Sequence, residues 1–169
     1  MPTVYFKKAG MMEIRTEDIQ LAEMSDEARV ALLKEMGGTR VLTITLSDVS
    51  FHLLIREIEN VEDRPTIFKF VSECVLALSG NIEKMVIFDI DSRSGMYRSY
   101  VTVRDARDDR TYNLDLHVTS ALTLAVASKC PIFVTEEVFE KSSKEVKKYM
   151  ENTVQRNFEN IDPEKLTKH

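Results

Sequence analysis

The sequence contains few of the residues that mark unusual protein classes. In 169 residues it has no tryptophan, two cysteines, four prolines and five glycines. Cys74 and Cys130 are far apart and lack metal-site spacing, so we interpret them as reduced thiols in a cytoplasmic protein. No stretch approaches the roughly 18 apolar residues of a membrane helix, and the N-terminus lacks the apolar core of a signal peptide. We therefore expect a cytoplasmic protein with no membrane segment.

An excess of positive charge is also missing. Lys and Arg total 23 against 28 Asp and Glu, which gives a formal net charge of −5. A strong, sequence-independent grip on nucleic acid comes from many Lys and Arg displacing counterions, and this composition argues against it. A local basic patch is still compatible with that balance. The chain has the length of a single domain with one hydrophobic core.

The first half of the chain predicts a hairpin followed by two helices. Residues 29–34 and 40–46 alternate as strands around a glycine turn at 37–38. Ser47 or Asp48 can cap a helix that continues through Ile58. Pro65 breaks the chain, and Thr66 can cap a second helix that ends before Gly80. Because this second helix is mostly apolar, we predict that it is buried.

The second half predicts three more strands and a helix. Residues 81–90 and 96–103 form a second hairpin around a D-S-R-S-G turn, and residues 111–116 add a third strand. Thr119 or Ser120 can cap the next helix, which stops at Cys130-Pro131. A short strand, I-F-V, and a helical turn follow. The predicted fold is a single α+β domain whose mixed, mostly antiparallel sheet packs against helices.

Three segments follow from this pattern. Residues 1–28 are an N-terminal strand or extension, residues 29–141 are the domain, and residues 142–169 form a C-terminal amphipathic helix and tail. In the last segment Val146, Met150, Val154 and Phe158 recur at helical spacing. Such a helix can dock on its own domain, the simpler reading, or on a partner.

Four stretches resemble the bifunctional nuclease (BFN) family, a widespread bacterial domain with plant relatives. They are VALLKEMGGTRVLTITL, the Arg64-Pro65 helix start, the VIFDID…GMYRSYVTV hairpin, and YNLDLHVTSALTLAVASKCPIFVTEEVFEK. Their order and spacing match the family across residues 30–141, and any single stretch would be weak. The resemblance implies an α+β domain that self-associates, with RNase and DNase activity in some members.

Several polar positions of the family motifs are replaced in this chain. Phe68 and Lys69 stand where the R-P-L-T-H-D-L motif has histidine and aspartate. In the D-A-R-P-S-D-A motif, Asp115 and Ala121 match, whereas His117 and Ser120 replace the arginine and the second aspartate. The resemblance therefore implies the fold more strongly than the nuclease chemistry.

Phosphodiester hydrolysis requires an activated water and stabilisation of charge on phosphorus. The remaining candidate catalytic residues are Arg64, Asp89, Asp91, Asp115 and His117. We expect Asp89 and Asp91 to share one strand face and Asp115 and His117 to share another, which would bring them to one sheet edge. The three aspartates are then candidate ligands for Mg²⁺ or Mn²⁺.

Structural roles explain the same residues equally well. Asp91 begins a turn in which an aspartate commonly accepts hydrogen bonds from backbone N–H groups. Asp115 can cap the following helix, and His117 can be an ordinary surface histidine. Titratable clusters at strand ends are more often structural than catalytic, so the structural reading is the favoured one.

A basic and aromatic strand is the candidate for binding RNA or DNA. Arg98, Tyr100 and Arg104 alternate to one side, and more arginines lie in the flanking turns. Tyr100 could stack on bases while the arginines contact phosphates. A solvated sheet face or a subunit contact would have the same pattern.

Two functions from different classes therefore remain. The first is a nuclease, weakened or inactive in this copy, that uses Asp115 and its neighbours with a divalent metal. The second is a non-catalytic, homo-oligomeric module for binding or regulation, which contacts its partners through the arginine-rich strand or the C-terminal helix. The replaced motif residues favour the second for mechanism, and the family resemblance favours the first.

Overall fold

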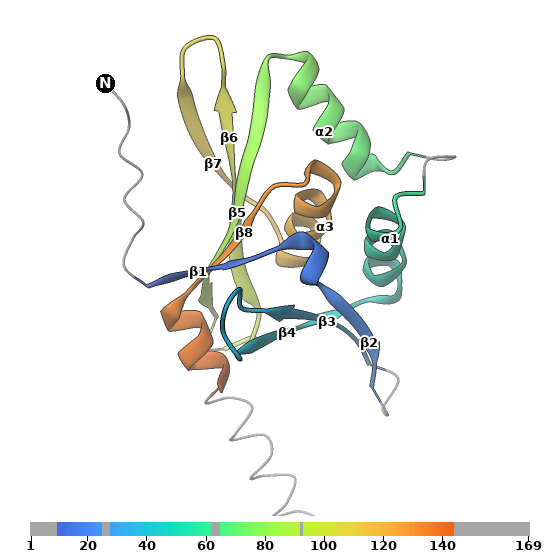
Figure 1. The fold of residues 1–169 in the computed structure, drawn as a ribbon, viewed down its shortest axis with the longest axis vertical. Helices are drawn as coiled ribbons and strands as arrows, with labels where there is room; N and C mark the ends of the chain where they lie inside the picture. The colour runs from blue at the N-terminus through green and yellow to red at the C-terminus, as the bar shows by residue number, and fades with distance from the viewer. Residues whose placement is uncertain (1–9, 25–27, 62–64, 92, 144–169) are drawn as a thin grey trace, which may run out of the picture.

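The computed structural model describes residues 10–24, 28–61, 65–91 and 93–143. These residues form an α+β domain with two sheets and helices packed between and beside them (Figure 1). The predicted fold class is confirmed. The predicted amphipathic helix lies almost entirely outside the described residues, as do residues 1–9.

The larger sheet has five strands in the order β1-β8-β5-β6-β7. The β5–β8 pair is parallel and the other pairs are antiparallel. The strands are β1 (Met11–Ile14), β5 (Gly80–Ile90), β6 (Tyr97–Asp105), β7 (Arg110–Asp115) and β8 (Ile132–Thr135). The predicted second hairpin is the β5–β6 pair.

The smaller sheet has the order β2-β3-β4 and is antiparallel. Its strands are β2 (Gln20–Glu23), β3 (Arg29–Lys34) and β4 (Val41–Leu46), and a short 3-10 helix, Thr16–Asp18, precedes β2. The β3–β4 turn places Gly37 at φ +72°, which glycine adopts without strain. Since β1 pairs with β8 and β2 pairs with β3, residues 11–23 contribute to both sheets.

Two predicted helix caps are confirmed. Ser47 accepts a hydrogen bond from Ser50 N–H at the start of α1 (Asp48–Ile58). Thr66 accepts one from Lys69 N–H at the start of α2 (Ile67–Ala77). Each side-chain oxygen satisfies one amide that the first helical turn leaves without a partner.

The predicted cap of the third helix is wrong. The helix α3 (Val118–Ser128) begins earlier than Thr119 or Ser120 would allow, and His117 is its N-cap. The imidazole of His117 accepts from Thr119 N–H at 3.4 Å. An imidazole nitrogen thus performs the role that sequence rules assign to a hydroxyl.

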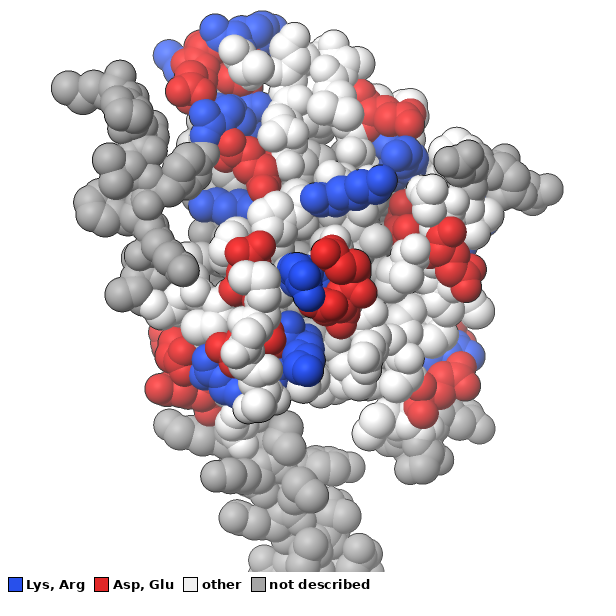
Figure 2. Space-filling model, in the orientation of Figure 1, with Lys and Arg blue, Asp and Glu red and all other residues white. Residues whose placement is uncertain are grey.

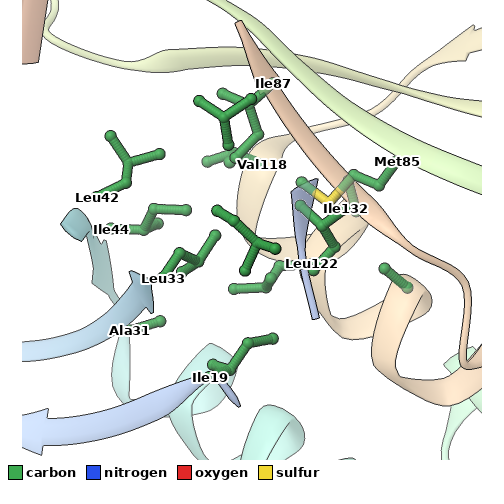
Figure 3. Packing of buried hydrophobic residues seen from close by; sticks show 14 of the residues in the cluster. Ile19, Ala31, Leu33, Leu42, Ile44, Met85, Ile87, Val118, Leu122 and Ile132 are labelled. Carbon is green, nitrogen blue, oxygen red and sulfur yellow. The ribbon is translucent and has the colours of Figure 1, made fainter. Parts of the chain in front are cut away.

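The core lies between the two sheets and α3 (Figure 3). Leu122 of α3, Leu33 and Ile44 of the smaller sheet, and Ile87 and Ile132 of the larger sheet are all fully or almost fully buried. Ala121 and Ala125 are fully buried as well, so small side chains let α3 approach its neighbours closely. The free thiol of Cys130 is also buried.

The prediction that α2 is buried is wrong. Among its described residues only Ser72 is buried, whereas Ile67, Phe70 and Val71 are exposed. Leu76 and Leu78 at its C-terminal end are exposed by 60% and 72%. The helix contacts α3 and β5, with Phe68 and Val75 packed against the core, and its other side is exposed within the described chain.

An ion-pair cluster joins the β3–β4 hairpin to the C-terminal helical residues 136–143. Arg40 pairs with Glu35 at 2.7 Å and also with Glu136, and its guanidinium lies 4.7 Å from the ring centre of Phe139. Acidic and basic side chains are likewise intermixed over the face drawn in Figure 2. None of the helices in the described part of the chain is long and apolar enough to cross a membrane.

Candidate functional site

Alternate residues of β6 place the candidate nucleic-acid contacts on one face of the larger sheet. Arg98 lies opposite Asp89 of β5, and Tyr100 lies opposite Asp115 of β7. Residues that oppose each other across paired strands share a face, so these four side chains lie on one side. We call this side the outer face, because Val101, the residue after Tyr100, points to the opposite side and belongs to the core.

Three side chains of the outer face form an aromatic cluster, defined as Phe88, Arg98 and Tyr100. The Phe88 and Tyr100 rings lie 5.6 Å apart at 40°, and the Arg98 guanidinium lies 5.2 Å from the centre of the Phe88 ring. Burial raises the pKa of the Tyr100 hydroxyl, so this group stays neutral and available as a donor. The cluster offers two π surfaces and one cation side by side.

Phe88 was not identified from the sequence. The pairing of β5 with β6 shifts between Ile87 and Asp89, which places Phe88 at a β-bulge. A bulge inserts one residue and re-aims the side chain, so strict alternation cannot assign its face. The run M-V-I-F is continuously apolar and gives no other signal.

The two candidate arginines of β6 differ in their partners. Arg104 pairs with Glu83 and, at 2.6 Å, with Asp109, so its charge is compensated within the domain. Across the described residues, Arg98 forms no ion pair within 4 Å, and it is exposed. Arg98 is therefore the arginine that can reach a phosphate without first breaking an ion pair, while it stays on the Phe88 ring.

Asp89 is held by a residue far along the chain. Its carboxylate accepts from Lys141 Nζ and from Ile90 N–H, each at 2.8 Å. The Lys141 ammonium, with these bonds, holds the pKa of Asp89 below its usual range, and Arg98 adds to the effect. Lys141 also pairs with Glu137 at 2.8 Å. Asp89 thus anchors the C-terminal helical residues to β5.

Asp91 has a local role, and the prediction that it shares a strand face with Asp89 is wrong. β5 ends at Ile90, and Asp91 lies in the turn. Its carboxylate accepts from the N–H groups of Arg93 and Ser94 at 2.8 and 2.9 Å, which lowers its pKa. The carboxylate thus caps two backbone amides of the turn, a role that aspartate commonly has at this position.

Asp115 and His117 are separated by the end of the strand, so the predicted shared strand face is again wrong. β7 ends at Asp115, whose side chain is exposed, and His117 already caps α3. The Nδ1 nitrogen of the His117 ring lies 3.0 Å from the Thr119 hydroxyl. That contact occupies one nitrogen of the imidazole.

His117 also lines a surface pocket of about 390 Å³ between β4, the β5–β6 turn and the start of α3. Thr43, Thr45 and Thr119 contribute its hydroxyl groups. The Tyr97 hydroxyl closes one wall by donating to the Thr43 carbonyl oxygen at 3.1 Å. Neither Asp89, Asp91 nor Asp115 lines this pocket.

The structure thus brings together some predicted residues and separates others. Asp89, Arg98, Tyr100 and Asp115 share the outer face, whereas Asp91 and His117 serve the turn and the helix cap. Arg64 lies outside the described residues. Within the part of the chain that the structure describes, no three His, Cys, Asp or Glu side chains group closely enough to hold a metal ion.

A family comparison now identifies the domain. The family model described as the bifunctional nuclease domain matches residues 31–147, which is more than half of the chain. The chain belongs to the bifunctional nuclease domain family. Among curated proteins, none matches the chain.

Within this BFN domain the replaced motif positions lie at two helix starts. Phe68 and Lys69 occupy the first turn of α2, and His117 and Ser120 lie at the start of α3. Family motif residues there would be a histidine and an aspartate in α2, and an arginine and an aspartate in α3. Both helices form in this chain with N-cap hydrogen bonds accepted by Thr66 and His117, so their formation here does not require those polar groups.

Proposed function

We propose that this BFN domain binds single-stranded nucleic acid on the outer face of its five-stranded sheet, and that hydrolysis is weakened or lost in this chain. The observation that carries the proposal is the aromatic cluster of Phe88, Arg98 and Tyr100. Stacking of one base on an aromatic side chain contributes about 1–3 kcal/mol and does not depend on base identity. The cluster supplies such a surface beside a cation.

Single strands fit this surface better than duplexes. Only an unpaired, unstacked base can present its flat face to Tyr100 or Phe88. The net charge of −5 and the neighbouring Asp89 and Asp115 oppose a broad phosphate contact. Affinity would then come from stacking and from one arginine, so it should depend weakly on salt, with a slope of roughly −0.7 per phosphate neutralised.

The proposal is tested by fluorescence anisotropy with labelled single-stranded RNA, single-stranded DNA and a duplex of the same sequence. We expect Tyr100→Ala to weaken single-strand binding about tenfold or more through loss of stacking. Tyr100→Phe is the matched control, because it keeps the ring, and it should bind within about twofold of the parent. Equal affinity of the two variants, or preference for the duplex, would contradict stacking on Tyr100.

The second candidate function is metal-assisted phosphodiester hydrolysis, which the family membership and the exposed Asp115 favour. Asp89, Asp91 and Asp115 were the expected ligands of Mg²⁺ or Mn²⁺. They do not fit one shared ion as they are arranged, because Asp89 bonds to Lys141 and Asp91 bonds to the turn amides. We therefore place nucleic-acid binding before hydrolysis.

End-labelled single-stranded RNA and DNA, incubated with the protein in Mg²⁺, Mn²⁺ or EDTA, separate the two candidates. We expect no cleavage above background by the parent or by Asp115→Ala on a denaturing gel. Cleavage that EDTA abolishes and Asp115→Ala lacks would show that this carboxylate suffices, and hydrolysis would then replace binding as the main function.

We also propose that the domain acts as a homo-oligomer. Support comes from large apolar side chains that the described chain leaves exposed on α2 and β7, including Phe70, Leu78, Tyr112 and Leu114. Contiguous exposed apolar surface commonly marks an interface. Sedimentation of the full chain at several concentrations tests this part separately from nucleic-acid binding.

A further inference from the structure

β7 is an edge strand of the larger sheet, and all six of its residues are exposed. Its pairing with β6 runs without a register shift from Arg110 to Asp115. Tyr112 and Leu114 lie opposite Val103 and Val101 of β6, on the side of the sheet that faces the core. They are nevertheless 46% and 53% exposed, so the apolar surface of this side continues to the edge without cover.

The hydrogen-bonding groups of β7 alternate between β6 and the free edge. Leu116 N–H donates to the Ser99 carbonyl of β6. Alternation in an antiparallel ladder then directs the backbone groups of Leu114, Tyr112 and Arg110 toward β6. The N–H and C=O groups of Thr111, Asn113 and Asp115 point outward, where no other described strand pairs with them.

The opposite edge of the same sheet is treated differently. At β1 the outward carbonyl of Glu13 accepts from Met36 N–H of the β3–β4 turn at 3.0 Å. Edge strands are otherwise protected by proline, lysine, bulges or a covering loop. β7 contains no proline and no lysine, its two charged residues, Arg110 and Asp115, stand only at its ends, and its ladder is regular. Within the described residues, one edge is therefore covered and the other is open.

We propose that β7 pairs antiparallel with β7 of a second copy of this chain, on a two-fold axis at Asn113. This inference rests on the homo-oligomer part of the proposed function and names its surface. Two residues that lie opposite each other in the paired strands point to the same face of the sheet. An odd-numbered residue of one copy therefore lies opposite an odd-numbered residue of the other. Centring on Asn113 pairs Asn113 with itself and Thr111 with Asp115, all with outward backbone groups.

The same register is complementary in its side chains. Tyr112 lies opposite Leu114 of the second copy, twice by symmetry, and side chains approach most closely at such non-hydrogen-bonded positions. Thr111 lies opposite Asp115, so no like charges oppose each other. Four apolar side chains, two from each copy, would cover one another.

The neighbouring allowed register is less favourable. If the two-fold axis passes through Tyr112, the only outward backbone groups of β7 that pair are those of Thr111 with Asn113. The same register places Arg110 opposite Leu114. That arrangement makes fewer ladder bonds and takes Leu114 away from Tyr112, its apolar partner in the register centred on Asn113. The exposed apolar side chains of α2 are the competing dimer surface, and the experiments below include that surface as an outcome.

Cysteine cross-linking tests the axis. In a Cys74→Ser background, Asn113→Cys places two thiols on a pair whose Cα atoms are about 5.5 Å apart, within the range of a disulfide. Thr111→Cys is the control, because its two copies lie about four residues, roughly 13 Å, apart along the strands. Oxidation should give covalent dimers with Asn113→Cys and few with Thr111→Cys. Equal yields, or dimers from Thr111→Cys alone, overturn the proposed register.

A charge on the core-facing side tests the surface. Leu114→Lys should raise the dimer dissociation constant about tenfold or more in sedimentation equilibrium, since it buries unpaired ammonium groups next to Tyr112. Leu78→Lys changes a more exposed leucine, at the C-cap of α2, and should leave the constant unchanged. A parent protein that is still monomeric at about 100 µM overturns the proposal. So does a result in which only Leu78→Lys dissociates the dimer.

The test is independent of nucleic-acid binding. Tyr100→Ala should weaken binding to single strands while leaving the dissociation constant of the dimer unchanged, because Tyr100 lies one strand inside the edge. If that variant loses binding and the parent is monomeric, the interface fails and the binding proposal stands. If the parent dimerises through β7 and binds no single strand, the reverse holds.

Discussion

The two faces of the five-stranded sheet are built from alternate residues of the same strands, yet they have different roles. On the core side Met85, Ile87 and Val101 are almost fully buried under α3 and the smaller sheet. On the outer face Arg98 is exposed and Tyr100 is half-buried, beside the carboxylates of Asp89 and Asp115. One side forms the core, and the other presents charged and aromatic side chains around the buried Val86 and Thr102.

The largest expected effect distinguishes the faces by stability. Ile87→Ala removes a fully buried side chain and should lower the free energy of unfolding by about 2–5 kcal/mol, since it leaves a cavity. Arg98→Ala on the outer face should change it by no more than about 0.5 kcal/mol. Urea unfolding followed by circular dichroism measures both. Similar losses would mean that the outer face also supports the core.

The next effect concerns binding alone. Arg98→Glu should weaken single-strand binding about tenfold, because the cation that stacks on Phe88 is replaced by a charge that repels phosphate. Arg107→Glu is the matched control, because Arg107 lies in the turn beyond β6 and pairs with Asp105. Anisotropy with the same oligonucleotide measures both. An equal loss in the two variants would indicate net charge rather than the aromatic cluster.

The smallest effect is the response to acid. The folded protein holds the pKa of Asp89 below its usual range, through Lys141 first, and that of Asp105 at about 2. Groups with lowered pKa values stabilise the fold above the unfolded pKa, near 4. That stability is lost as the pH falls through the folded values. The free energy of unfolding should thus decrease below about pH 4.

Asp89→Asn tests the assignment of this pH dependence. The variant lacks the titrating carboxylate, so its free energy of unfolding should fall less steeply between about pH 5 and pH 3 than that of the parent. This range brackets the ordinary carboxyl pKa of about 4. Urea titrations measure the free energy at each pH. Asp48→Asn, at an exposed carboxylate, is the comparison. A parent-like slope for Asp89→Asn would assign the acid response to other groups.

Local signals predicted most of the elements. The hairpin of β3 and β4 follows from alternation around Gly37, and Ser47 and Thr66 cap α1 and α2 as expected. The cap of α3 was missed because His117 is a rare N-cap. Each correct prediction depends on interactions between residues that are close in the sequence, within about one helical turn or one hairpin turn.

The helices α2 and α3 show where composition is insufficient. Both are 11 residues long and mostly apolar, yet α3 has seven buried residues and α2 has one. Small residues such as Ala121 and Ala125 let α3 pack closely against β5, β6 and the other two helices, whereas the bulkier α2 contacts mainly α3 and β5. Burial depends on the surfaces that neighbours leave available, and a helix does not encode these by itself.

The candidate site divides in the same way. Alternation placed Arg98, Tyr100 and Arg104 on one side of β6, whereas the partners that distinguish Arg98 from Arg104 come from bulges and turns. Phe88 joined the cluster only through a bulge. Pairing shifts of this kind arise from the fit of two strands, so neither strand alone predicts them.

By itself the sequence determined the class of fold, the hairpins, two helix caps and the acidic net charge, because these depend on composition, backbone torsions and hydrogen bonds between near neighbours. The tertiary structure alone decided the order β1-β8-β5-β6-β7, the exposure of α2 and the contact of Lys141 with Asp89, 52 residues apart. Such features depend on which distant surfaces meet, and many pairings are compatible with the same local signals.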